Sequence, residues 1–363
     1  MTRRVKSGQT TPALSGYTDL LGGISELLRE ARIAAGRVVN NIVTATYWEI
    51  GRRIVEYEQK GAERAEYGAM LLKRLAGDLT RRFGKGFSYS NLNLFRQFYL
   101  IYRERLPILQ SVIVESSLTE KTRPAFRLSW THYVRLLPIT ENPKRDFYEE
   151  EAMRAGWSVR QLERQIDAML FERVALSRKK ASLLGKAERE GETAIPEEAI
   201  KDPYILDFLG IPEQHSEKEL EDALIAHLTE FLLEMGYGFT FVARQKRLQI
   251  GSQSFYLDLL LYHRRLRCLV AIDLKIGHFT HADAGQMNMY LNYLNENETA
   301  EDEERPVGLI LFSEKDEAVA HYALGGLSNK IFASRYKLQL PDPATLIREI
   351  NAERLRLESK ERT

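Results

Sequence analysis

At 363 residues, 44% of them hydrophobic and 28% charged, the chain is long enough for two or three globular domains and is neither a small disulfide-stapled domain nor a disordered segment. Its single cysteine, Cys268, excludes an intrachain disulfide and a cysteine-rich zinc site. The formal net charge of +1 hides two opposed halves, because residues 1–180 hold 31 Lys and Arg against 20 Asp and Glu, and residues 181–363 hold 21 against 31.

The first half of the chain is predicted to be helical almost throughout. Apolar residues recur at intervals near 3.6 over residues 20–57 and again over residues 70–79, which predicts two helices. A third helix is expected to begin at Ser88 or Ser90, because serine is a good N-cap residue, and to end before Pro107.

The next stretch, residues 112–123, is polar and irregular and predicts a loop. Three further helices are expected after it, over residues 129–138, 143–156 and 158–176. The last of them begins with a capping box formed by Ser158 and Gln161.

A charged stretch without apolar periodicity separates the two halves and predicts a linker. We therefore expect three parts. They are a helical, basic DNA-binding or assembly domain, a linker and a second domain, over residues 1–178, 179–203 and 204–363.

The second domain is predicted to contain both helices and strands. Ser216 and Glu219 form another capping box, which begins a helix that ends at Gly236. Three strand-like runs with short turns follow, over residues 239–250, 254–263 and 266–276. The remaining elements are a helix, a buried strand, a helix, a strand and a last helix, expected at residues 285–295, 307–312, 315–322, 336–340 and from 343 onward.

This order predicts the fold class. Strands joined by short turns pair antiparallel, whereas a strand that follows a helix implies a parallel crossover. The chain is therefore expected to be α + α/β, with a helical N-terminal domain followed by an α-β-β-β-α-β domain built on a mixed sheet.

Two acids lie inside otherwise apolar strands of this sheet. An ionised Asp258 between Leu257 and Leu259 would be costly to bury without a partner. By the two-residue period of a strand, Asp273 and Lys275 share one face, and the turn after His263 is expected to bring Asp258 opposite Asp273.

Like charges at that separation favour a cation between them, and oxygen ligands are those that Mg²⁺ prefers. Asp258 and Asp273 are therefore the candidate metal ligands, and Mn²⁺ is a plausible substitute for Mg²⁺. Lys275 could orient a water molecule or stabilise charge on a phosphoryl group. The alternative is an ordinary cross-strand ion pair between Lys275 and one of the acids.

The D…D-x-K pattern resembles the PD-(D/E)xK nuclease superfamily, and FYLDLLLYHRRLRCLVAIDLKIGHFTHADAGQMNMYL resembles its YhcG-type members. The strings YWEIGRRI, FGKGFSYSNLNLFRQFY and GWSVRQLERQI in the first half fit the same family. The resemblance implies a restriction-endonuclease-like domain and a metal-dependent phosphodiesterase in which Lys275 is the catalytic lysine.

The resemblance also implies further site residues. A glutamate from the helix before the sheet corresponds to Glu221, which could equally be a solvated helix acid. A Q-x-x-x-Y pair corresponds to Gln286 and Tyr290. At i and i+4 the pair shares one helical face and could reach a substrate phosphate, although Tyr290 fits core packing equally well. Two departures are Leu257 in place of the superfamily's proline and Asp273 where the subfamily more often has glutamate.

The basic half contains a turn between two helices, FGKGFSYS, which is typical of a helix-turn-helix segment. Its candidate contacts to DNA phosphates and bases are Arg81, Arg82, Lys85, Asn91 and Arg96. The alternative is a helical bundle that mediates dimerisation.

These patterns favour a metal-dependent deoxyribonuclease, and the alternative is a catalytically silent DNA-binding or assembly component that acts with a partner protein. An RNA substrate is disfavoured because aromatic RNP-like strands are missing. DNA is the expected partner, and cutting both strands of a duplex favours a homodimer. The sequence contains no GxxxxGK[ST] motif, so we expect no nucleotide cofactor. No run approaches the ~18 apolar residues of a membrane helix and no signal peptide is recognised, so we expect a cytoplasmic protein without a membrane partner.

Overall fold

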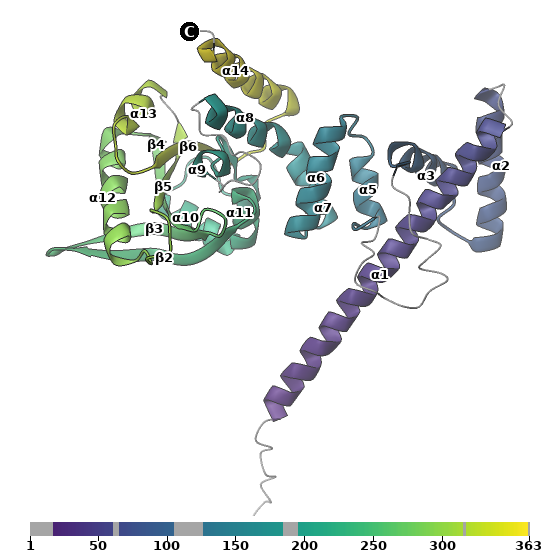
Figure 1. Ribbon diagram of the computed structural model, residues 1–363, viewed down its shortest axis with the longest axis horizontal. Coiled ribbons are helices and arrows are strands. Elements are labelled where there is room, and N and C mark those ends of the chain that lie inside the picture. Colours follow the sequence, from purple (N-terminus) through teal and green to yellow (C-terminus); the bar gives the residue numbers. More distant parts are fainter. Residues whose placement is uncertain (1–16, 61–64, 105–125, 184–194, 315–316, 362–363) are drawn as a thin grey trace, which may run out of the picture. The chain divides into compact units, whose positions relative to one another are not determined.

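The computed structural model describes residues 17–60, 65–104, 126–183, 195–314 and 317–361 (Figure 1). The chain divides into two compact units, Met1–Arg145 and Asp146–Thr363. The three-part division expected from the sequence stays a prediction, and residues 184–194 of the expected linker lie outside the described residues. Across the described parts of the chain, no helix is long and apolar enough to cross a membrane.

The first unit is helical, as predicted. Its helices are α1 (Tyr17–Lys60), α2 (Ala65–Phe83), α3 (Tyr89–Ile101) and α5 (Trp130–Leu136). Helices α1, α3 and α5 meet in an aromatic cluster, where the Tyr47 ring stacks on Phe95 with centroids 4.2 Å apart and Trp130 packs edge-on against both. The loop expected at residues 112–123 lies outside the described residues.

A tight turn joins α2 to α3. Gly84 and Gly86 adopt φ of 84° and 114°, a region that side chains disfavour. Ser88 is the N-cap of α3 and accepts a hydrogen bond from Asn91 N at 3.2 Å. Asn91 in turn donates from Nδ2 to Gly86 O at 2.9 Å, so its side chain closes the turn.

Helices α6 (Asn142–Ala155), α7 (Val159–Asp167) and α8 (Leu170–Leu183) follow. The sequence predicts one helix over residues 158–176, but Met169 has a φ of 50° and the structure divides the helix there. The capping box of Ser158 and Gln161 is confirmed at the start of α7.

The second unit contains a six-stranded sheet in the order β1-β6-β5-β4-β3-β2. Strands β2, β3 and β4 pair antiparallel, whereas β4, β5, β6 and β1 pair parallel. The strands are β1 (Tyr204–Ile205), β2 (Phe239–Ile250), β3 (Gln253–His263), β4 (Cys268–His278), β5 (Val307–Glu314) and β6 (Ile331–Lys337).

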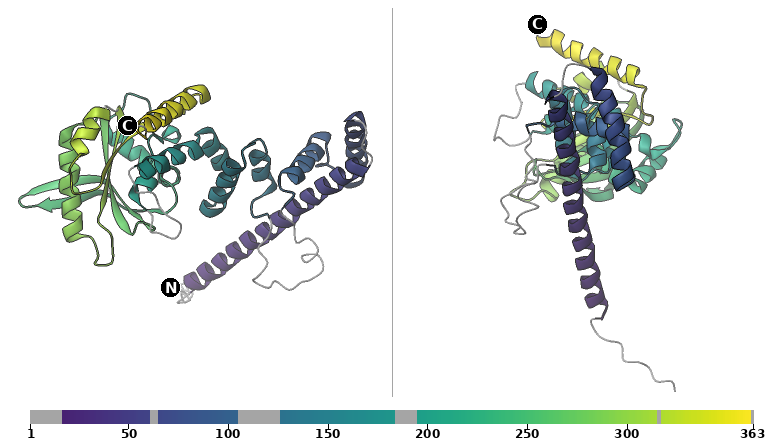
Figure 2. Two further views of the ribbon diagram at one scale, coloured as in Figure 1. Left: turned by 45° about the horizontal axis from the view of Figure 1, so that its top comes forward. Right: turned by 90° about the vertical axis from the view of Figure 1, so that its right-hand side faces the viewer.

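Helices cover both faces of this sheet (Figures 1 and 2). One face packs on α10 (Glu217–Ala226) and α11 (Leu228–Met235) through a core that includes Leu220, Phe231 and Ile272. The other packs on α12 (His281–Asn297) and α13 (Glu317–Leu324) through Met287, Leu291 and Ile310, among others. The predicted fold class, a helical N-terminal domain followed by an α-β-β-β-α-β domain with a mixed sheet, is confirmed.

Some elements differ from the sequence-based predictions. The helix expected from Ser216 to Gly236 is interrupted at His227, which separates α10 from α11. The last strand begins at Ile331, five residues before its predicted start. The short β1, the helix α9 (Pro196–Ala199) and the helix α14 (Pro343–Glu361) complete the unit.

Candidate active site

The candidate active site lies where β3 and β4 part. Their last paired residues are Leu259 and Ile272, and one step further along the same register Asp258 stands opposite Asp273. Asp258 accepts a hydrogen bond from the backbone N–H of Leu274 through Oδ2, at 2.8 Å. The carboxylate thus satisfies a β4 amide at the point where the ladder of backbone hydrogen bonds ends.

Asp273 is the most deeply buried acid of this group, with 2% of its surface exposed. The Lys275 ammonium lies 2.8 Å from Asp273 Oδ2. Burial raises the pKa of Asp273, the Lys275 charge opposes that rise, and the neighbouring Asp258 charge adds to it. Burial also raises the pKa of Asp258, while the hydrogen bond from Leu274 opposes the shift. Two carboxyls of raised pKa therefore share one ammonium.

Lys275 remains a cation at this position. Burial disfavours its charged form, but Asp273, Glu217 and Asp258 outweigh burial and raise the pKa of the ammonium above its usual value. At neutral pH Lys275 is therefore a hydrogen-bond donor and a positive charge rather than a base.

Glu221 reaches the group from α10. Its carboxylate is buried, and it accepts hydrogen bonds from Arg244 Nε at 2.6 Å and from Gln245 Nε2 at 2.7 Å. The same Gln245 nitrogen donates to Asp258 Oδ1 at 3.0 Å. The structure thus connects Glu221 to Asp258 through one amide group.

Helix α12 brings Gln286 and Tyr290 to the same group. Gln286 Nε2 donates to the Tyr290 hydroxyl at 2.5 Å. The Tyr290 hydroxyl in turn donates to Tyr256 O at 3.5 Å. Tyr290 is 1% exposed, so it also belongs to the core. Burial raises the pKa of Tyr290, and the charges of Asp273 and Asp258 add to that shift. The phenol therefore stays protonated beside the acids.

Three residues around these acids were missed by the sequence analysis. Arg244 and Gln245 lie in β2, where nothing in the string ARQKR distinguishes them from surface residues. Glu217, one turn before Glu221 on α10, accepts a hydrogen bond from Ile276 N at 3.3 Å. Its i, i+4 spacing from Glu221 was the available signal.

The donor set fits a hard divalent cation. Asp273 Oδ2 is buried, and apart from the Lys275 ammonium no donor in the described parts of the chain reaches it. Each oxygen of Asp258 accepts one hydrogen bond and keeps a lone pair. Mg²⁺ is commonly held by one or two carboxylates and completes its shell with water and phosphate oxygens. Within the described ranges, however, no three or more His, Cys, Asp or Glu side chains lie close enough together to coordinate one metal ion.

The candidate DNA-binding residues of the first unit fall into two classes. Arg81, Arg82 and Lys85 are exposed at the end of α2 and in the turn after it. Arg96 instead donates to Glu58 Oε2 at 2.7 Å, and Asn91 closes the turn. Arg82 and Lys85 are thus exposed, and Arg81 is exposed although it pairs with Asp78 on the same helix at 3.4 Å, whereas Asn91 and Arg96 have partners in the turn and on α1.

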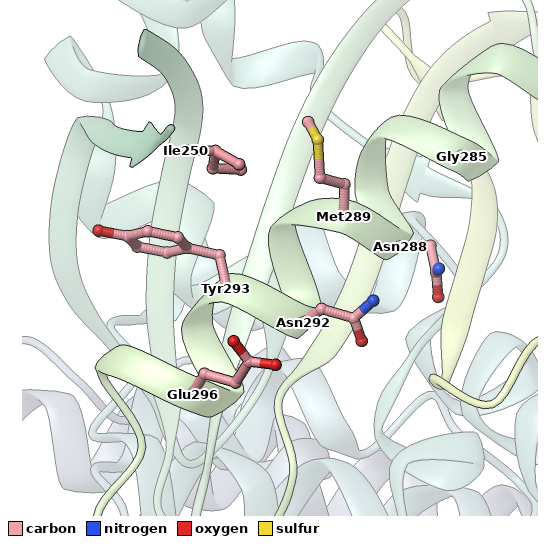
Figure 3. A pocket seen from close by; sticks show the side chains of 7 residues that line it. All are labelled: Ile250, Gly285, Asn288, Met289, Asn292, Tyr293 and Glu296. Atoms are coloured by element: carbon pink, nitrogen blue, oxygen red, sulfur yellow. The ribbon is translucent and has the colours of Figure 1, made fainter. Parts of the chain in front are cut away.

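A hollow of about 280 Å³ lies beside α12 (Figure 3), and its lining residues do not include Asp258, Asp273 or Glu221. Its charged lining residue is Glu296, and neither Lys nor Arg contributes to the wall. A carboxylate-lined surface does not complement a phosphate, so this hollow is a poor candidate for the scissile group. It is lined by Ile250, Gly285, Asn288, Met289, Asn292, Tyr293 and Glu296.

Two family models match the chain. The YhcG PDDEXK nuclease domain matches residues 197–351, and the DUF1016 N-terminal domain matches residues 23–173.

Two solved structures are also similar, a repair endonuclease from Pyrococcus abyssi (19% identity) and EndoMS in complex with double-stranded DNA (18% identity). Each has a TM-score of 0.25, and the matches cover 35% and 31% of this chain and about half of those chains (49% and 44%). The family assignment does not depend on them.

A curated relative in Escherichia coli (strain K12) carries the name "Putative nuclease YhcG". It is 47% identical over 352 residues, which cover 93% of this chain and 94% of the relative. The resemblance expected from the sequence is confirmed over both halves of the chain. The chain therefore belongs to the YhcG family of PD-(D/E)xK nucleases.

Proposed function

We propose that the protein is a Mg²⁺-dependent nuclease that hydrolyses phosphodiester bonds of DNA. The observation that carries the proposal is the placement of Asp258, Asp273 and Lys275 at one fork between two strands. Two acids of raised pKa beside a single ammonium are the arrangement that a divalent cation would neutralise.

In this proposal Asp258 and Asp273 hold the cation, with Mn²⁺ as a substitute. The bound ion supplies Lewis acidity toward a phosphate oxygen. Lys275 donates a hydrogen bond to the attacking water or to the phosphoryl oxygens, and its positive charge offsets the negative charge that develops there. Because its pKa is raised, Lys275 does not remove the proton from the water itself.

The surrounding residues complete the proposed assignment. Glu221 contributes a third carboxylate through its hydrogen bond to Gln245. Gln286 and Tyr290, joined to each other by a hydrogen bond, are proposed to donate to a substrate phosphate. The exposed Arg81, Arg82 and Lys85 of the first unit are proposed to contact the DNA backbone, while Asn91 closes the turn that carries Lys85 and Arg96 joins α3 to α1.

The test is Lys275→Ala. We expect this variant to keep its affinity for DNA and to lose Mg²⁺-dependent cleavage by at least about 100-fold, since a preorganised charge is lost. Lys337→Ala is the matched control, because Lys337 on β6 forms an ion pair with Glu349 outside the site. Cleavage is measured on linear, supercoiled, branched and single-stranded DNA, and undiminished cutting by Lys275→Ala would refute the assignment.

A second candidate is a catalytically silent component that binds DNA and works with a partner protein. The observation that favours it is internal neutralisation, because Lys275 pairs with Asp273 and Arg244 pairs with Glu221. The same substrate panel separates the two candidates. DNA binding without turnover in Mg²⁺ or Mn²⁺ on every substrate supports the silent component.

We also propose that the protein acts in the cytoplasm. We further propose that it is a homodimer, because one site cuts one strand and two sites are needed for a double-strand cut. Sedimentation of the protein with and without duplex DNA measures the oligomeric state. A monomer that makes double-strand cuts would contradict the dimer.

A further inference from the structure

Gln245 has an unusual backbone conformation in the middle of β2. Its φ is 47°, in the left-handed region that costs a residue other than glycine about 1–2 kcal/mol. The pairs on either side, Arg244 with Leu259 and Lys246 with Leu257, place Gln245 opposite Asp258 on β3. A strained residue at the centre of a strand persists only where its surroundings compensate for it.

The compensation comes from the Gln245 side chain. Its Nε2 donates one hydrogen bond to Glu221 Oε2 at 2.7 Å and another to Asp258 Oδ1 at 3.0 Å. The two hydrogens of a single NH₂ group therefore bridge two carboxylates that would otherwise repel each other. The reversed amide would direct its carbonyl oxygen at both carboxylates, so the chemistry fixes the orientation of the amide.

These contacts determine how both acids are held. Asp258 is fixed through Oδ1 by Gln245 and through Oδ2 by Leu274 N. Glu221 is fixed through Oε2 by Gln245 and through Oε1 by Arg244. Each carboxylate has one donor on each oxygen, and the Gln245 amide is the group common to both.

We infer that Gln245 is a positioning residue that holds Asp258 and Glu221 at a fixed separation and so prepares Asp258 to bind a divalent cation. The inference rests on the proposed function and adds to it the residue on which the metal affinity of that site depends. It acts through the two acids rather than on the substrate, as residues that hydrogen-bond metal ligands do.

The experiment measures Mn²⁺ binding to the full-length, DNA-free protein by calorimetry. Gln245→Met keeps the side-chain length and removes both donors, and we expect it to bind Mn²⁺ about 10- to 100-fold more weakly than the unmodified protein. Gln249→Met, the same change elsewhere on β2, should leave the affinity unchanged. With DNA and subsaturating Mn²⁺, we expect Gln245→Met to lower kcat while KM for DNA stays the same.

Gln245→Gly separates the amide from the backbone conformation, because glycine adopts φ near 47° without strain. It should weaken Mn²⁺ binding as much as Gln245→Met does, and thermal unfolding verifies that both variants fold. If either folded variant binds Mn²⁺ as tightly as the unmodified protein does, the inference is overturned while the proposed function stands. If the unmodified protein itself binds no Mn²⁺, the proposed function fails and this inference fails with it.

Discussion

The His263 imidazole is buried at the end of β3, with 3% of its surface exposed. Its Nδ1 accepts a hydrogen bond from Leu266 N at 3.0 Å and its ring packs edge-on against Phe239. Burial lowers the pKa of His263 to about 4, and the nearby Arg265 charge adds to the shift. The imidazole is therefore neutral at physiological pH and acts as a structural acceptor in the β3–β4 turn.

This single residue should make stability depend on pH. Because the folded-state pKa of about 4 lies below the 6.5 of the unfolded chain, the unfolded chain binds more protons between these values. The stabilisation is complete above pH 6.5 and is lost as pH falls toward 4, by up to about 3 kcal/mol. His263→Asn keeps an acceptor for Leu266 N, so its free energy of unfolding in urea should vary less with pH over this interval.

The exposed His281 at the start of α12 provides the control for this measurement. His281→Asn should retain the pH dependence of the unmodified protein. A slope in His263→Asn equal to that of the unmodified protein would contradict the assignment.

Individual residues differ in how well the sequence predicts them. Asp258, Asp273 and Lys275 could be picked out because charged residues are rare between apolar strand residues. Gln245 could not, since its importance depends on a left-handed backbone conformation that places its amide between two carboxylates. Arg96 illustrates the opposite case, because a basic residue on a predicted DNA-binding helix has an internal partner in Glu58.

Helix α12 approaches the sheet closely because β5 has a glycine beneath it. A Cβ on Gly308 would lie 2.6 Å from Met287 Cγ and 3.2 Å from Leu291 Cδ1, inside van der Waals contact. The close packing places α12, and with it Gln286 and Tyr290, against the strands that carry the acids. Around Gly285, on the outer side of the same helix, no packing neighbour among the described residues comes within 4 Å of the position that a Cβ would take.

This contrast predicts opposite effects of one substitution. Gly308→Ala should destabilise the protein by about 1–3 kcal/mol, because the added methyl group overpacks the interface with Met287 and Leu291. Gly285→Ala should stabilise it by about 0.5–1 kcal/mol, because alanine loses less backbone entropy in a helix than glycine does. Urea-unfolding midpoints of the two variants give the signs, and equal effects would contradict the packing explanation.

Elements with local signals were predicted well, and elements defined by distant contacts were not. The capping boxes at Ser158 and Ser216 mark the starts of α7 and α10 as predicted. The two-residue β1 exists because it pairs with β6 through a contact between Tyr204 and Tyr336 that no local pattern encodes. The start of β6 was placed too late, because the polar Arg335 interrupts the apolar pattern and its backbone N–H finds its acceptor in Asp202, far away in sequence.

At the scale of the whole molecule, a buried group of charged side chains joins α7 and α8 to β1, to the residues that follow it and to α11. Arg173 and Glu234 are both fully buried and lie 2.6 Å apart. Arg164 pairs with Asp207 at 2.6 Å, and Glu234 also accepts from Ile205 N at 3.0 Å. Burial opposes the ionisation of Glu234, but the charges of Arg173 and Lys201 lower its pKa to about 2.

The pairing predicts a large effect of Arg173→Met. Removing one partner leaves the buried Glu234 charge without its closest cation, which should lower the free energy of unfolding by about 3–5 kcal/mol. Arg154→Met is the control, because Arg154 forms a partly exposed pair with Glu151 and should cost less than about 1 kcal/mol. Urea unfolding followed by circular dichroism compares the two, and a cost for Arg173→Met no larger than that of the control would show that the buried pair is dispensable.

The buried position of Cys268 has a practical value. Its side chain is 1% exposed, and burial raises the pKa of its thiol to about 12, so almost none of it is the reactive thiolate at neutral pH. Maleimide dyes should leave the native protein unlabelled. A cysteine introduced at Asp302, whose side chain is 81% exposed, would then carry a single fluorophore without any need to replace the native thiol.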